Sequence, residues 1–211
     1  MVNFSKLLYL PLDIPNPPDI ASKLDSIPYE EMIEDNYRTC NHIPIMTRYG
    51  DWTELSKLVP ELVDWCEENL FTWAEKSRIM IITTQPYDHN ATHIDCSPGK
   101  FNTWQHKFRY VLRGNVDSLY FVSKNTYQNV PQIDKPYMMS GRWPHAMHNN
   151  LDQTKYTLAL GSPWEPDNND EKYMKVLEKS YNKYQEYYMS FEELELPEDY
   201  ENLFEQKYKT N

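Results

Sequence analysis

The sequence predicts a mainly β protein with flanking helices, and two observations support this prediction. From Arg78 onward, short runs of strand-forming residues alternate with turn signals such as Pro98-Gly99 and Gly114-Asn115. Four of the five glycines, at positions 99, 114, 141 and 161, fall between these runs. Several short strands at such spacing are typical of a sandwich or a barrel.

A single domain is expected, because 211 residues suffice for one sizeable core. Residues 78–164 are predicted to form the β core. Residues 1–77 are expected to be an extended and helical flank, and residues 165–211 an acidic, tyrosine-rich helical tail. The tail carries much of the negative charge of the chain.

The N-terminal flank is predicted to start as an extended surface segment, because residues 8–20 are rich in proline and proline is excluded from sheet interiors. A short helix over 19–24 and a strand over 42–49 should follow. Asp51 or Thr53 is expected to cap a helical region, and Pro60 suits the first turn of a second helix.

The core is expected to contain seven strands, over residues 79–84, 92–96, 107–112, 118–123, 137–140, 143–147 and 156–160. In the tail, apolar and tyrosine residues recur at helical spacing between Tyr173 and Phe191. This pattern predicts a helix that packs its tyrosine face on the β core. An oligomer contact or a lid over the substrate is the alternative, so the tail is also compatible with a homodimer.

Composition argues against several classes of protein. The formal net charge is -11 and no basic stripe is present, which disfavours a nucleic-acid partner. No run approaches the roughly 18 apolar residues of a membrane span. The three cysteines are widely spaced, with no CxxC pair, and no secretory signal opens the chain, so a reducing, cytoplasmic location is expected.

His93-Ile94-Asp95 is the first candidate metal-binding motif. On an extended strand His93 and Asp95 project to the same face, and one histidine from a neighbouring strand would complete a set of two imidazoles and one carboxylate. Such a facial triad holds non-haem Fe(II) and leaves positions open. His145 and His148 are the candidates for the third ligand, and either alone is as readily a structural histidine.

Lys155 and Arg109 are candidate cations near this site, each on an expected core strand. A buried cation needs an anionic partner, because an unpaired charge inside a barrel is costly. A dicarboxylic co-substrate would supply that partner. Exposure on an edge strand is the alternative for both residues.

The order of these segments resembles the 2-oxoglutarate- and Fe(II)-dependent oxygenases, and most of all their aspartyl/asparaginyl β-hydroxylase-like branch. The resemblance covers roughly residues 78–164. It is carried by His93-Ile94-Asp95, by Arg109-Tyr110-Val111-Leu112, by Pro144-His145-Ala146-Met147-His148-Asn149 and by Lys155-Tyr156-Thr157-Leu158. It implies a double-stranded β-helix core of the jelly-roll or cupin kind, and Fe(II), 2-oxoglutarate and O2 as cofactor and co-substrates.

The resemblance also implies roles for individual residues. His93, Asp95 and His145 would be the metal ligands, with His145 preferred because His145 to Asn149 matches the family pattern H-x-[VM]-x-N. Lys155 stands where the family usually has an arginine that pairs with 2-oxoglutarate, and lysine offers a point charge in place of a bidentate fork. Arg109, Tyr110 and Thr157 are the other expected co-substrate contacts.

The implied activity is that of a dioxygenase that hydroxylates an amino acid or a peptidyl Asp, Asn or Pro side chain. Arg142, Trp143 and Trp104 are the expected substrate-binding residues, and Arg142 suits a substrate carboxylate. Two alternatives stand beside this interpretation: a cupin-type metalloenzyme that does not use 2-oxoglutarate, and a non-catalytic β-barrel that serves as a binding or structural module.

Overall fold

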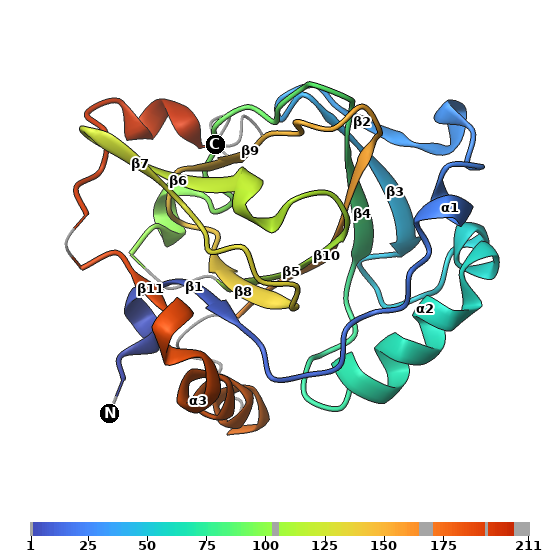
Figure 1. The fold of residues 1–211 in the computed structure, drawn as a ribbon, viewed down its shortest axis with the longest axis horizontal. Helices are drawn as coiled ribbons and strands as arrows, with labels where there is room; N and C mark the ends of the chain where they lie inside the picture. Colours follow the sequence, from blue (N-terminus) through green and yellow to red (C-terminus); the bar gives the residue numbers. More distant parts are fainter. Residues whose placement is uncertain (1, 103–105, 165–170, 193, 205–211) are drawn as a thin grey trace.

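Two antiparallel sheets form the core of the computed structural model, which describes residues 2–102, 106–164, 171–192 and 194–204 (Figure 1). Within these residues the larger sheet has the order β11-β1-β8-β5-β10-β4-β3-β2 and the smaller one the order β7-β6-β9. The strands are β1 Leu7–Pro11, β2 Ile33–Asp35, β3 Cys40–Met46, β4 Ile79–Thr84, β5 His106–Arg113, β6 Leu119–Ser123, β7 Thr126–Asn129, β8 Tyr137–Ser140, β9 His145–Met147, β10 Lys155–Trp164 and β11 Met189–Ser190.

The chain passes repeatedly between the two sheets. β4, β5, β8 and β10 belong to the larger sheet, whereas β6, β7 and β9, which follow β5 and β8 in the sequence, belong to the smaller one. His93, between β4 and β5, forms an isolated antiparallel bridge with His145 of β9 and so extends the smaller sheet. This winding is that of a double-stranded β-helix, so the predicted fold class is confirmed.

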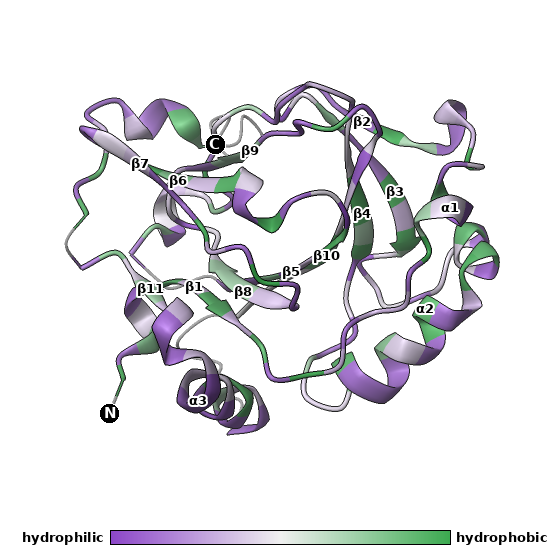
Figure 2. Cartoon of the chain, in the orientation of Figure 1, coloured by the Kyte–Doolittle hydropathy of each residue, from purple (hydrophilic) through white to green (hydrophobic). Residues whose placement is uncertain are grey.

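Three helices cover one face of the larger sheet: α1 Ala21–Leu24, α2 Pro60–Trp65 and α3 Glu171–Tyr184 (Figure 1). Leu24, Leu62 and Leu177, one from each helix, join strand residues such as Phe108 in a single buried apolar layer. Hydrophobic and hydrophilic residues alternate around α2 and α3, as an amphipathic helix requires (Figure 2). Short turns complete the described residues: 3-10 turns at Phe4–Lys6, Tyr29–Glu31, Glu54–Leu58, Pro98–Lys100, Val116–Ser118, Gln185–Tyr187 and Tyr200–Leu203, and a π turn at Cys66–Leu70.

A second apolar layer lies between the two sheets. Val111 and Tyr137 from the larger sheet pack there with Phe121 and Met147 from the smaller one. Because side chains alternate along a strand, the odd-numbered residues of β5 face this interior and the even-numbered ones face the helices. The candidate site lies on the interior side.

The predicted strands over 79–84 and 137–140 and the helix starting at Pro60 are confirmed. The segment over 8–20 was wrongly predicted to stay on the surface, because Leu7–Pro11 is a fully buried strand between β11 and β8. Pro11 is tolerated because β11 pairs with β1 only at Leu7 and Tyr9, which leaves Pro11 with a strand neighbour on the β8 side alone. The predicted strand over 92–96 is reduced to single bridges at His93 and Ile94.

The C-terminal helix is shorter than predicted. α3 ends at Tyr184, and β11 then pairs with β1 at the edge of the larger sheet. Tyr173 of α3 is buried in the helix-side layer, which supports packing on the β core. None of the helices in the described parts of the chain is long and apolar enough to cross a membrane.

Leu10→Val is expected to lower the free energy of unfolding by about 1 kcal/mol, because it removes one buried methylene group from a strand interior. Leu10 is 0% exposed. The matched control is Leu58→Val at a position that is 46% exposed, where the change should stay within about 0.5 kcal/mol. Chemical denaturation checks both values, and equal effects would show that β1 is not part of the core.

Candidate functional site

His93, Asp95 and His145 come together between the two sheets, and all three are buried. The Nε2 atom of His93 lies 3.5 Å from Oδ1 of Asp95, and Nε2 of His145 lies 3.8 Å from Oδ2. Two ligand atoms at right angles around one ion, each about 2.1 Å from it, lie about 3 Å apart. Small side-chain rotations would therefore bring the three groups to coordination distance.

Backbone contacts fix the orientation of both imidazole rings. Nδ1 of His93 lies 2.7 Å from the carbonyl oxygen of Ala91, and Nδ1 of His145 lies 2.8 Å from that of Trp143. A carbonyl oxygen only accepts, so each Nδ1 carries the proton and donates it. Burial, reinforced by His93, lowers the pKa of His145 to about 3, which keeps that ring neutral. A neutral ring with Nδ1–H has its lone pair on Nε2, the atom directed at Asp95.

Asp95 carries the negative charge of the site. Burial alone would raise its pKa, but the guanidinium of Arg38 outweighs this effect and holds the pKa of Asp95 well below its usual range. Nη2 of Arg38 lies 2.7 Å from Oδ1, and Nη2 of Arg109 lies 3.3 Å from Oδ2. Each carboxylate oxygen has more than one lone pair, so these contacts orient the carboxylate and leave acceptor capacity for a cation.

Arg109, an expected co-substrate contact, is thus found beside Asp95. Its guanidinium is buried and also donates to the carbonyl oxygen of Phe108 at 2.9 Å. The positive charge is close to the candidate metal site, and in this structure its anionic partner is Asp95.

Lys155 is the first residue of β10 and is 1% exposed. Its Nζ donates to the carbonyl oxygen of Asn115 at 2.9 Å and to the hydroxyl of Ser118. Both partners are neutral, and none of the ion pairs found among the described residues involves Lys155. Burial lowers the pKa of this amine to about 7, against the attraction of Asp117. Lys155 is therefore a buried basic group that pairs with no carboxylate of the described residues. This agrees with the prediction that a dicarboxylic co-substrate would supply its anionic partner.

Thr157 and Tyr110 lie on opposite sides of the larger sheet. Thr157 is buried on the interior face, where its hydroxyl approaches Sδ of Met147 at 4.0 Å. Tyr110 belongs to the helix-side layer, and its hydroxyl donates to Asp134 at 3.0 Å. The expectation that Tyr110 contacts the co-substrate is therefore not supported, because strand alternation turns it away from Arg109 and the metal ligands.

Two of the expected substrate-binding residues, Arg142 and Trp143, make their polar contacts within the chain. Trp143 is buried, stacks on Phe191 and donates from its indole nitrogen to Val122. The guanidinium of Arg142 packs over the same Phe191 ring and donates to the carbonyl oxygens of Ser5 and Phe101. Arg142 is half-buried, and both side chains are engaged in contacts within the chain. Trp104 lies outside the described residues.

Arg38 is a site residue that sequence reasoning missed. It follows β2, donates from Nη1 to Asp35 at 3.3 Å and reaches Asp95 with Nη2. Because Arg38 lies in a short hairpin turn, no local pattern in the sequence indicates its contact with a residue 57 positions away.

His148, the other candidate for the third ligand, lies on the opposite side of β9 from His145, with its ring near Tyr120.

Comparison with known proteins finds structural neighbours but no sequence relatives. No family model matches the chain, and no curated protein matches it. The prolyl hydroxylase of Trichoplax adhaerens, solved with a hypoxia inducible factor peptide fragment, is 16% identical, with a TM-score of 0.47 over 80% of this chain and 85% of that chain. A Pseudomonas putida prolyl-4-hydroxylase is 13% identical, with a TM-score of 0.44 over 77% and 94%.

A third neighbour is an oxidoreductase of the 2OG-Fe(II) oxygenase family from Burkholderia pseudomallei. It is 11% identical and has a TM-score of 0.40, with 66% of this chain and 74% of that chain covered. Similarity at this level does not extend to substrate or activity. The narrower resemblance to the aspartyl/asparaginyl β-hydroxylase-like branch stays a prediction.

Proposed function

We propose that the chain is an Fe(II)- and 2-oxoglutarate-dependent dioxygenase with His93, Asp95 and His145 as its metal ligands. One observation supports this most directly: two imidazole lone pairs and a carboxylate converge in a buried space. Atoms that all bear lone pairs repel one another unless a cation lies between them. Two histidines and one carboxylate are the donor set of non-haem Fe(II) sites that keep positions open.

Lys155 is proposed to bind the distal carboxylate of 2-oxoglutarate. It is a buried amine on the interior side of β10, and its neutral partners leave its charge uncompensated. Thr157, two residues further along the same face, is the proposed hydroxyl contact. Arg109 contributes a second positive charge near the metal end of the co-substrate.

When bound, the iron and 2-oxoglutarate would supply the oxidising chemistry that hydroxylates a C–H bond. The chain itself holds the ligands in place. Backbone carbonyls at Ala91 and Trp143 orient the two rings, Arg38 keeps Asp95 ionised, and Arg109 pairs with the second carboxylate oxygen. Burial of all three ligands limits the access of water to the reacting centre.

The substrate is proposed to be an amino acid or a peptidyl Asp, Asn or Pro residue, which rests on the family resemblance alone. Arg142 and Trp143 are not proposed to bind it, because the polar groups of both side chains already bond to carbonyl oxygens of the chain. A cytoplasmic location remains a prediction from the cysteine pattern, and a homodimer remains one from the tyrosine-rich tail.

Anaerobic addition of Fe(II) and then 2-oxoglutarate to the metal-free chain tests the proposal. A weak visible charge-transfer band is expected only when both are present, because 2-oxoglutarate chelates the metal. Thermal unfolding should shift upward with each ligand. Absence of the band and of both shifts would contradict the proposal, whereas a shift with metal alone would favour the cupin-type metalloenzyme.

A further inference from the structure

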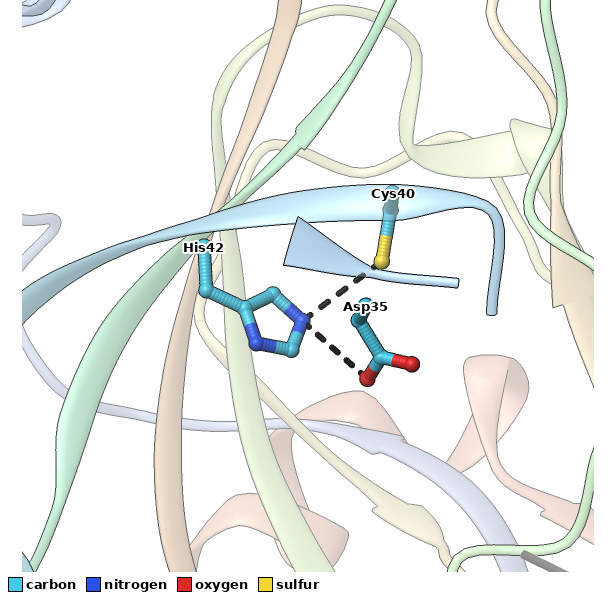
Figure 3. A group of neighbouring side chains, drawn as sticks. All are labelled: Asp35, Cys40 and His42. Carbon is cyan, nitrogen blue, oxygen red and sulfur yellow. Dashed lines mark hydrogen bonds and ion pairs between the residues drawn. The ribbon is translucent and has the colours of Figure 1, made fainter. Parts of the chain in front are cut away.

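A second group of potential metal ligands lies in the β2–β3 hairpin and consists of Asp35, Cys40 and His42 (Figure 3). Asp35 and Cys40 are directly paired across the two strands. His42 is two residues beyond Cys40, so both side chains leave β3 on the same face. Cys40 and His42 are buried, and Asp35 is partly buried.

The three donor atoms converge on one small volume. Sγ of Cys40 lies 3.5 Å from Nε2 of His42, and that nitrogen lies 3.9 Å from Oδ2 of Asp35. All three atoms are within 4.8 Å of one another. Tetrahedral zinc with ordinary bond lengths separates sulfur from nitrogen by about 3.5 Å and nitrogen from oxygen by about 3.3 Å. A small movement of the Asp35 carboxylate toward His42 would therefore bring all three donor atoms to the spacing of a tetrahedral site.

Cysteine, histidine and aspartate also form catalytic relays with a cysteine nucleophile, but the geometry of this group does not fit such a relay. In a Cys-His-Asp relay the thiol contacts one imidazole nitrogen and the carboxylate contacts the other. Here both the sulfur and the carboxylate face Nε2 of His42 (Figure 3). Burial also raises the pKa of the Cys40 thiol to about 12, so no resting thiolate is available as a nucleophile.

We propose that Asp35, Cys40 and His42 form a second metal site, separate from the His93-Asp95-His145 group, that takes a borderline-soft divalent cation such as Zn²⁺. A thiolate, an imidazole and a carboxylate are all ligands that zinc accepts, whereas the thiolate disfavours Mg²⁺ and Ca²⁺. As the metal–sulfur bond forms, the Cys40 proton leaves to solvent. The two negative ligands then balance the charge of the ion.

The surroundings connect this group to the first site. A surface hollow of about 170 Å³ at the hairpin is lined by residues that include Asp35 and Cys40 but not His42. Three protein ligands leave one coordination position for a ligand from outside. Arg38 contacts Asp35 on one side and Asp95 on the other, so the second site would fix the hairpin that orients Asp95.

Cobalt titration of the metal-free chain tests the proposal, because Co²⁺ bound to a thiolate absorbs strongly in the near ultraviolet. The band is expected in the full chain and in the His93→Ala/His145→Ala double variant, which lacks the first site. Cys40→Ser should abolish it. Cys66→Ser is the matched control at a buried cysteine in the helix-side layer, and it should keep the band.

Asp35→Asn is the conservative variant, since this partly buried side chain changes little in size. It should weaken Co²⁺ binding at this site by more than about tenfold while circular dichroism stays that of the unchanged chain. Zn²⁺ competition should erase the band. The proposal is overturned if the full chain shows no band, if Cys40→Ser keeps it, or if Cys96→Ser beside Asp95 removes it.

Discussion

Replacing His93 or His145 by alanine is expected to abolish Fe(II) binding at the first site, a loss of at least about a thousandfold in affinity. Each change removes one of only three protein ligands and leaves two, too few to hold the ion against water. Each variant also loses the backbone contact of the ring that it removes.

His148→Ala is the matched control, because that residue lies three positions from His145 but faces away from Asp95. Anaerobic Fe(II) binding, followed by calorimetry on each variant, gives the comparison. Every sample should also carry Cys40→Ser, so that the proposed second metal site in the β2–β3 hairpin does not contribute to the measured binding. Loss of Fe(II) in His148→Ala with retention in His145→Ala would show that the third ligand was chosen wrongly.

Lys155→Met is expected to weaken 2-oxoglutarate binding about 10- to 100-fold, with Fe(II) affinity unchanged. Methionine keeps the length and apolar stem of lysine but removes the charge-assisted hydrogen bonds to a carboxylate, which contribute about 1.5–3 kcal/mol. Titration of 2-oxoglutarate into the Fe(II)-loaded chain measures the effect. Equal losses of metal and co-substrate would indicate misfolding.

The same contact should make 2-oxoglutarate binding depend on pH. The pKa of Lys155 in the free protein is lowered to about 7, and a bound carboxylate would raise it. The dissociation constant should therefore be flat below about pH 7 and rise above it, by up to about tenfold per pH unit, because the neutral amine must first be protonated. Lys155→Met should show no such rise, and a flat profile in the unchanged chain would contradict the assignment.

Much of the β core could be predicted from local pattern. The strands over 79–84 and 137–140 have the predicted bounds, because short runs of strand-forming residues and the turn residues that flank them act within a few positions. The choice of His145 over His148 came from a short motif, and the structure brings His145 to Asp95. These features are encoded in neighbouring residues.

Other predictions failed where distant segments decide the outcome. Residues 8–20 look like a proline-rich surface segment, yet the strand Leu7–Pro11 at its start pairs with β8, more than a hundred residues later. Tyr110 was read as a co-substrate contact beside Arg109, but strand alternation turns it toward the helices. Trp143, two residues before His145, is predicted to bind the substrate, but its ring packs on Phe191 from the C-terminal region.

The sequence alone indicated the kind of chemistry: two histidines, an aspartate and a lysine, in an order and spacing that resemble one family. Only the tertiary structure decided their surroundings, namely the arginine pair on Asp95, the neutral partners of Lys155, and the donor atoms of the β2–β3 hairpin. The physical reason is that strand periodicity and turn residues act locally. Charge contacts and metal-ligand geometry depend on which distant strands pair, and no local pattern records that.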